Sequence, residues 1–141
     1  MKSAFLMLAS LSVLLSACSN PKFPEKQADS MRLTLYEDER GYYRKTPVLV
    51  DVTDPDRIGE IVSVLKEGTR NPDHKCGDAG HITLTYMDGT EVQATILPGH
   101  DREYYEFRQM GSNYRVPRDA FLTALKNAGI DIAIIPQGRS E

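Results

Sequence analysis

The feature that most constrains the fold is a pair of alternating segments joined by Asp88-Gly89. In His81–Met87 and in Thr90–Ile96, apolar and polar side chains alternate, which is the period of a strand with one buried face. An Asp-Gly pair between two such segments is typical of a two-residue hairpin turn, because both turn positions need a positive φ. The sequence therefore predicts an antiparallel hairpin in the middle of the chain.

Further segments on both sides of this hairpin have the composition of strands. Met31–Tyr36 alternates with a period of two, and Val48–Val52 does the same after a proline. Two shorter segments, Tyr104–Arg108 and Tyr114–Val116, flank a glycine turn. Ile130–Ile135 is expected to add a final edge strand.

Two segments have the pattern of amphipathic helices that begin near a proline and end at a glycine. The first runs from Pro55 to Gly68, with Thr53 or Asp54 as its N-terminal cap. The second runs from Pro117 to Gly129. The apolar stripes are Ile58, Ile61, Val62 and Leu65 in the first helix, and Phe121, Ala124, Leu125 and Ala128 in the second.

Strands joined by short turns, with only two helices, predict an α+β fold. We expect an antiparallel sheet of about five to six strands with both amphipathic helices packed on one face. The chain has 141 residues, of which 40% are hydrophobic and 26% charged, as in one globular domain. The second face of the sheet is polar, and it is therefore expected to be solvated or to bind a partner.

The start of the chain has the features of a bacterial export signal. Lys2 precedes the apolar stretch Ala4–Leu15, which is too short to span a membrane, and the stretch ends in Leu15-Ser16-Ala17-Cys18. These four residues resemble the lipobox of bacterial lipoproteins, a large aliphatic residue followed by two small residues and cysteine. The resemblance implies cleavage before Cys18, a diacylglycerol on its sulfur, and further acylation, such as palmitate, on its amine.

This resemblance also implies a location, and together with the polar, proline-containing composition of residues 19–30 it divides the chain. Ser19, which stands where an aspartate would retain a lipoprotein in the inner membrane, implies sorting to the outer membrane with the domain facing the periplasm; a host with one membrane would hold the protein at its cell membrane. The expected parts are a signal peptide (1–17), a lipidated N-terminus with a flexible tether (18–30), one globular domain (31–135) and a C-terminal tail (136–141).

The net charge of -3 gives no support for nucleic-acid binding. No sequence motif for a cofactor, a phosphate-binding loop or a known catalytic constellation is present, so a non-enzymatic protein without a cofactor is expected. One cluster still combines several metal-ligating residue types: His74, Cys76, His81 and His100. Its spacing matches no known zinc motif, and the alternative is a glycine-rich surface loop.

Cys76 would have no partner in the chain if Cys18 carries lipid, and three states are open to it: a buried inert thiol, a disulfide with another molecule, or a reactive thiol. A nucleophilic pair with a histidine would need a third group to orient the imidazole, and the sequence indicates none.

The main functional hypothesis is a binding module anchored at the envelope by lipid, with another envelope protein as its partner. In size and address it resembles small periplasmic lipoproteins that inhibit, or give immunity against, wall-degrading toxins. Two alternatives are a metal-binding or thiol-redox protein and a structural envelope lipoprotein. The candidate partner-binding residues come from the polar face of the sheet and from the region 102–118, which is rich in tyrosine and arginine. They are Thr83, Thr85, Gln93, Tyr104, Arg108 and Arg115.

Overall fold

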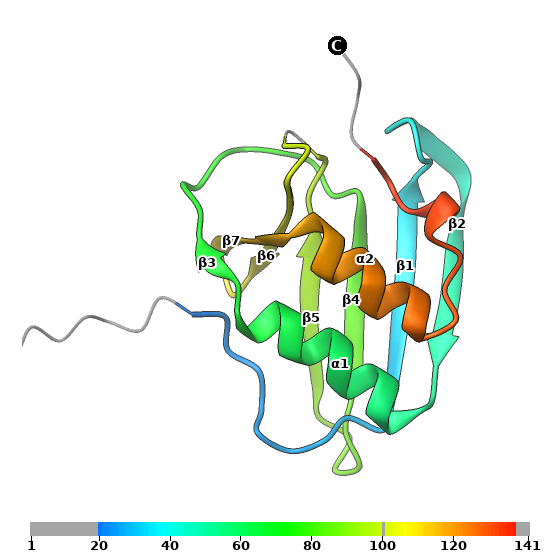
Figure 1. Ribbon diagram of the computed structural model, residues 1–141, viewed down its shortest axis with the longest axis vertical. Helices are drawn as coiled ribbons and strands as arrows, with labels where there is room; N and C mark the ends of the chain where they lie inside the picture. The colour runs from blue at the N-terminus through cyan, green and yellow to red at the C-terminus, as the bar shows by residue number, and fades with distance from the viewer. Residues whose placement is uncertain (1–19, 100, 138–141) are drawn as a thin grey trace, which may run out of the picture.

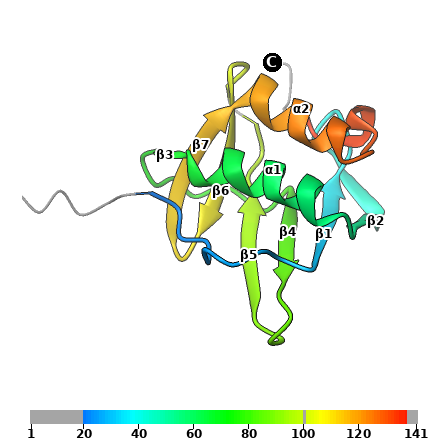
Figure 2. The ribbon, with the colours of Figure 1, turned by 60° about the horizontal axis from the view of Figure 1, so that its bottom comes forward.

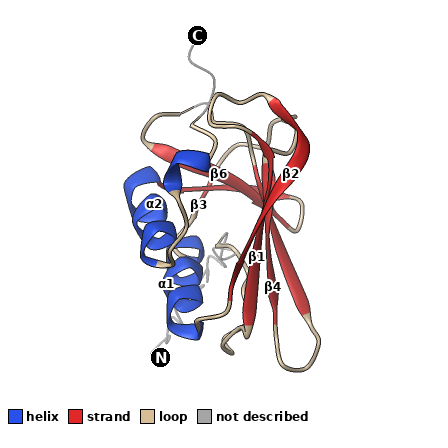
Figure 3. Cartoon of the chain, turned by 90° about the vertical axis from the view of Figure 1, so that its right-hand side faces the viewer, coloured by secondary structure: helices blue, strands red, loops and turns tan. Residues whose placement is uncertain are grey.

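The computed structural model describes residues 20–99 and 101–137. In this part of the chain one antiparallel sheet has the strand order β2-β1-β4-β5-β6-β7-β3, and two helices lie side by side on one of its faces (Figures 1 and 3). The strands are β1 (Ser30–Glu37), β2 (Tyr43–Val52), β3 (Thr69–Arg70), β4 (Gly80–Thr85), β5 (Glu91–Ile96), β6 (Tyr104–Gln109) and β7 (Ser112–Pro117). The helices are α1 (Pro55–Lys66) and α2 (Arg118–Asn127), and η1 (Ile132–Ile134) is a short 3₁₀ helix.

The predicted α+β class and the antiparallel sheet are confirmed, with seven strands among the described residues instead of five to six. The additional strand is β3, which pairs Thr69 and Arg70 with Arg115 and Tyr114 of β7. Two residues are too few to show an alternating pattern, so no local pattern predicts this strand, which pairs only with β7 among the described residues.

Both helices bury the expected apolar stripe against the sheet. In α1, Asp54 is the cap, and its side chain accepts hydrogen bonds from the backbone N–H groups of Asp56 and Arg57 at 3.0 and 3.3 Å. In α2, Pro117 occupies the cap position itself and makes no side-chain cap. The residues of the stripes that the structure buries are Ile58, Ile61 and Leu65 in α1, and Phe121, Ala124 and Leu125 in α2.

The prediction of an edge strand at Ile130–Ile135 is wrong, because this segment forms the short helix η1. Asp131 caps the short helix by accepting a hydrogen bond from the backbone N–H of Ala133 at 3.0 Å. Ile130 and Ile135 are both buried in the core, on either side of the turn. The same apolar residues that suggest a strand are therefore used to fix a turn against the core.

Residues 20–29, which we call the N-terminal strap, pack along the end of the sheet (Figures 1 and 2). Phe23 and Ala28 are buried in the main core, and the backbone N–H of Asp29 donates to the carbonyl of Thr85 at 2.9 Å. The described part of the expected flexible tether is thus part of the packed domain. The expected signal peptide and Cys18 lie outside the described residues.

The polar face of the sheet carries a row of side chains that are aligned by strand register. Thr34 of β1 is opposite His81 of β4, which is opposite Thr95 of β5. Thr95 is in turn opposite Arg108 of β6, and Arg108 is opposite Asn113 of β7. Because alternate residues of a strand point to the same face, Glu106 shares this face with Arg108. The row positions the candidate site.

Candidate functional site

The loop between β3 and β4, residues 71–79, is fixed over the polar face of β6 and β7. The backbone N–H of Asn113 donates to Oδ1 of Asp73 at 3.2 Å. The Nη2 group of Arg108 donates to the backbone carbonyl of His74 at 3.2 Å. A loop that bonds the underlying strands in this way holds its side chains at defined positions above them.

Three side chains of this loop meet the carboxylate of Glu106, which lies on β6 beneath it. We call these four residues the thiol site: Cys76, His74, Glu106 and Asn71. The distance from Nδ1 of His74 to Sγ of Cys76 is 2.8 Å. The distance from Nε2 of His74 to Oε2 of Glu106 is also 2.8 Å. The amide Nδ2 of Asn71 donates to the other carboxylate oxygen, Oε1, at 2.8 Å.

The hydrogen bonds of Glu106 determine which nitrogen of His74 carries the proton. A carboxylate only accepts hydrogen bonds, so Nε2 of His74 has to be the donor in its bond to Oε2. In the neutral imidazole, Nδ1 then has a lone pair directed at Cys76. The thiol S–H donates to this lone pair, which is the geometry of a base ready to remove the proton.

The thiol site is buried at its base and half-buried at Cys76 and His74. Glu106 is 8% exposed and Asn71 9% exposed, whereas the side chain of His74 is 32% exposed. Burial raises the pKa of the Cys76 thiol, the negative charge of Glu106 raises this pKa further, and the positive charge of Arg108 lowers it. Cys76 is therefore a protonated thiol at neutral pH, in agreement with the hydrogen bond to Nδ1.

This arrangement has the form of an activated nucleophile. The nucleophile and its base lie within hydrogen-bond distance, and a third group, Glu106, orients the base. Asn71 in turn fixes the carboxylate. The thiolate is the reactive form of nucleophilic, redox and metal-binding cysteines alike. Because the pKa of Cys76 is raised, attack by this thiol depends on transfer of its proton to His74.

The structure brings together only part of the cluster expected to bind metal. His74 and Cys76 are adjacent, but His81 lies in a different group, where its Nδ1 contacts Nε2 of Gln93 and, at 3.3 Å, Oγ1 of Thr95. His100 lies outside the described residues. Within the ranges 20–99 and 101–137, no group of three or more His, Cys, Asp or Glu side chains has the geometry to hold a metal ion.

The expected partner-binding residues lie on the polar face but divide into two groups. Thr83 and Gln93 are directly opposite each other on β4 and β5, and Thr85 follows on the same face of β4. Arg115 of β7 stacks over the ring of Tyr104 with its guanidinium carbon 4.4 Å from the ring centroid. Arg108, the sixth, belongs to the loop-fixing contacts of the thiol site.

Glu106 and Asn71 are the site residues that sequence reasoning missed. By strand alternation Glu106 faces outward, and an outward carboxylate on a strand is ordinarily solvated. The polar face at this point is covered by the loop, which buries Glu106. No local pattern indicates that cover, so only the path of the chain could have identified the two residues.

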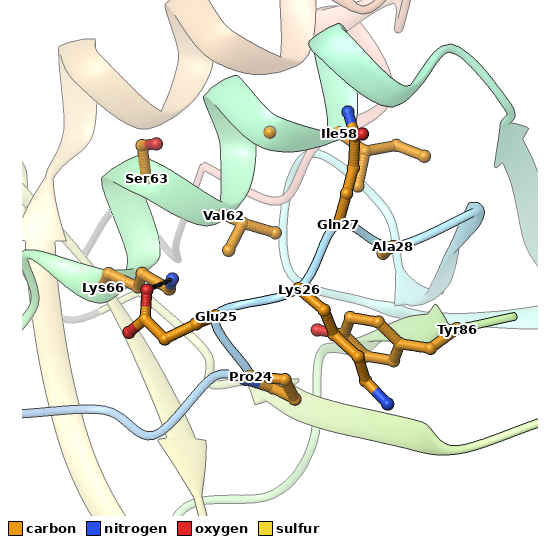
Figure 4. Close-up of a pocket in the computed structure, with 11 residues that line it drawn as sticks. Pro24, Glu25, Lys26, Gln27, Ala28, Ile58, Val62, Ser63, Lys66 and Tyr86 are labelled. Carbon is orange, nitrogen blue, oxygen red and sulfur yellow. Dashed lines mark hydrogen bonds and ion pairs between the residues drawn. The ribbon is translucent and has the colours of Figure 1, made fainter. Parts of the chain in front are cut away.

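A separate pocket lies between the strap and α1, with a volume of about 200 Å³ (Figure 4). The apolar side chain of Val62 and the ring of Tyr86 face it from opposite sides in this view. No lining residue of this pocket belongs to the thiol site. The lining consists of Pro24, Glu25, Lys26, Gln27, Ala28, Ile58, Gly59, Val62, Ser63, Lys66 and Tyr86.

Comparison with known proteins adds little to this geometry. No family model matches the chain, and no curated protein matches it. Among solved structures, a thioesterase-like protein from Clostridium sporogenes is similar at 13% identity, with a TM-score of 0.41, over 73% of this chain and 97% of that chain. A likeness at that level does not extend to function, which has to be argued from this chain's own residues. Among the described residues, no helix is long and apolar enough to cross a membrane.

Proposed function

We propose that this protein is a thiol-dependent acyl-transfer enzyme with Cys76 as its nucleophile. The single observation that carries the proposal is His74, placed 2.8 Å from Sγ of Cys76 on one side and 2.8 Å from the carboxylate of Glu106 on the other. The substrates that suit such a site are esters, thioesters or amides. The proposal replaces the sequence-based expectation of a protein without enzymatic activity.

The reaction proceeds through a covalent intermediate. Nδ1 of His74 takes the thiol proton while Sγ of Cys76 attacks the carbonyl carbon, forming a C–S bond. The bond to the leaving group breaks, and the leaving group takes the proton from Nδ1. Water then attacks the thioester, with His74 again receiving the proton and returning it to Sγ. Glu106 holds the imidazole throughout and stabilises its charged form.

The experiment is acylation of the purified protein by an activated ester, detected as a mass increase on Cys76. Cys76→Ser should abolish the modification, and His74→Ala should slow it by roughly 10²–10⁴-fold. His81→Gln is the matched control, because it removes a histidine of the same polar face that does not contact Cys76. Equal rates for the wild type and His74→Ala would refute the proposal.

Glu106→Gln tests the orienting role with little change of shape. Because Asn71 donates to Oε1, the glutamine has to keep its carbonyl there and present its NH₂ group to Nε2 of His74. Nε2 must then accept, and Nδ1 carries the proton and is no longer a base for Cys76. We expect acylation to slow by about 10²-fold or more, as loss of the correct tautomer does in other triads.

We further propose that the chain is held at the envelope membrane by lipid on Cys18. The lipobox-like residues Leu15–Cys18 support this location. Cys18→Ser should release the protein from the membrane fraction, and mass spectrometry of the wild type should find a diacylglycerol and an acyl chain on Cys18. Two or more chains are needed for stable anchoring.

The uncovered part of the polar face supports a second candidate, the binding module. Thr83, Thr85 and Gln93 lie there on neighbouring strands, away from the loop that covers Glu106. A saturable envelope partner that is lost on Gln93→Arg but kept by Cys76→Ser would favour binding. An acyl-enzyme on Cys76 would favour catalysis.

A further inference from the structure

The start of the strap is fixed to the hairpin formed by β6 and β7. The backbone N–H of Lys22 donates to Oε1 of Gln109 at 2.6 Å, and Nε2 of Gln109 donates back to the carbonyl of Lys22 at 2.6 Å. Gln109 is 2% exposed, and Lys22 alone satisfies both ends of its buried side-chain amide. This reciprocal pair determines where the chain leaves the domain.

The position of Lys22 limits how far the domain can lie from a lipid on Cys18. Three residues lie between them, which makes four steps along the chain, and an extended chain spans at most about 3.6 Å per step, so Cys18 lies within ~14 Å of Lys22. Gln109 binds the strap at Lys22, so the tip of the β6–β7 hairpin is the part of the sheet that the expected anchor holds by the shortest length of chain.

The tip of this hairpin exposes an apolar side chain. Met110 is 80% exposed, and it has a φ of 50°, in the region that non-glycine residues seldom adopt. Gly111 follows with a φ of 79°. Asn, Asp or Gly would suit such a turn better, and Met110 contributes nothing to the core. Neither the turn nor the packing explains a methionine at this position.

We propose that the β6–β7 tip contacts the lipid bilayer, with Met110 inserted among the headgroups. The exposed cation of Lys22 lies beside this tip and is attracted to anionic headgroups. The proposal rests on the lipid anchor at Cys18 and does not depend on the chemistry of Cys76. Contact between this tip and the bilayer fixes the orientation of the domain on the membrane, which a lipid anchor alone leaves free.

A second exposed methionine provides the alternative orientation. Met87 is 91% exposed at the turn between β4 and β5. The strap contacts this turn through Lys26, whose ammonium group pairs with Asp88. Since Lys26 is twice as far along the chain from Cys18 as Lys22 is, the anchor constrains this turn less.

The experiment uses the lipidated full-length product in vesicles of zwitterionic and anionic phospholipids. The protein contains no tryptophan, so Met110→Trp, Met87→Trp and Leu49→Trp each introduce a single fluorescent reporter. Leu49 is 59% exposed on β2, at the opposite edge of the sheet, and is the matched control. Brominated lipids quench tryptophan that enters the bilayer.

We expect quenching at position 110 to be several-fold stronger than at positions 87 and 49, with a blue-shifted emission. Adding Gln109→Ala should reduce the quenching at 110 while the protein still floats with the vesicles, because the strap is released and the anchor remains. Equal quenching at all three positions, or strongest quenching at 87, would overturn the orientation. A protein that lacks acylation and does not float would overturn the anchor and the orientation together, whereas the acylation assay of Cys76 would be unaffected.

Discussion

Glu106 affects Cys76 in two ways, through charge and through His74. Its negative charge raises the pKa of the thiol, and the charge of Arg108 lowers it. Its carboxylate also sets the tautomer of His74, because it accepts the Nε2 hydrogen bond. Glu106→Gln changes both, so the effect of charge is measured by the thiol pKa and the effect of orientation by the rate of acylation.

At this scale we predict opposite shifts of the Cys76 pKa in two variants. Glu106→Gln removes the negative charge and should lower the thiol pKa, although acylation slows. Arg108→Met removes the positive charge and should raise the pKa. The pH dependence of iodoacetamide alkylation, followed by mass spectrometry, measures both. Shifts in the same direction would contradict the electrostatic account.

Tyr105 gives a residue-scale prediction for stability. Its side chain is buried, its O–H donates to the carbonyl of Pro136 at 2.5 Å, and burial raises its pKa to about 12. The unfolded chain has a tyrosine pKa of about 10. The folded protein holds the proton more tightly, so this contribution is complete below pH 10 and is lost as the pH rises toward 12.

The corresponding loss in the free energy of unfolding is about 3 kcal/mol. Denaturant titrations at several alkaline pH values should show it, and Tyr105→Phe should remove that part of the pH dependence. A wild-type slope that survives unchanged in Tyr105→Phe would assign the effect to other groups.

At the scale of the elements, close packing between β1 and β4 depends on Gly80. A Cβ at this position would lie 2.4 Å from the backbone carbonyl oxygen of Thr34, which cannot move without shifting the strand. In α1, by contrast, a Cβ on Gly59 would have no atom within 4 Å. The same substitution therefore has opposite expected effects in the two elements.

We predict that Gly80→Ala lowers the free energy of unfolding by about 1–3 kcal/mol through overpacking. Gly59→Ala should raise it by about 0.5–1 kcal/mol, because alanine loses less conformational freedom in a helix interior. Urea unfolding curves of the two variants test this pair. Destabilisation by Gly59→Ala would show that the helix needs that space.

At the scale of the whole molecule, the strap connects the expected anchor to the core. Phe23 belongs to the same buried cluster as the strands and helices, so the strap is held by apolar packing as well as by Gln109. The fold thus positions the β6–β7 hairpin beside Lys22, near the start of the described residues. Arg108, which holds the loop of the thiol site, is two residues from Met110, about 7 Å along the strand.

We predict that Phe23→Ala detaches the strap while the sheet stays folded. The amide of Asp29, which donates to Thr85, should exchange its hydrogen much faster, whereas the amides of β1 keep their protection. The loss in unfolding free energy should stay below the roughly 3–5 kcal/mol of a phenylalanine deletion in a closed core, because the strap can leave. Phe23→Leu is the control and should keep the strap in place. Hydrogen exchange by NMR measures each position.

Local sequence determined the elements that depend on local rules. The hairpin around Asp88-Gly89, the Asp54 cap and the buried stripes of both helices follow from turn, capping and periodicity preferences that act within a few residues. The expected two-residue turn is wrong in its detail: Met87, Asp88 and Gly89 form the turn between Tyr86 and Thr90, and of these only Gly89 has a positive φ. The lipobox-like residues are likewise local, and the anchor they imply stays a prediction. His74 and Cys76 could be selected as candidates because they are neighbours in sequence.

Only the tertiary structure decided what these residues do together. Glu106 reaches His74 because β6 pairs with β7 in one register and the loop after β3 folds back over both strands. The segment containing Ile132–Ile134 is a short helix instead of a strand, and Ile130 and Ile135 on either side of it are buried in the core. Such contacts join residues far apart in the chain, and their free energy depends on the register and loop path of the complete fold, which no short pattern contains.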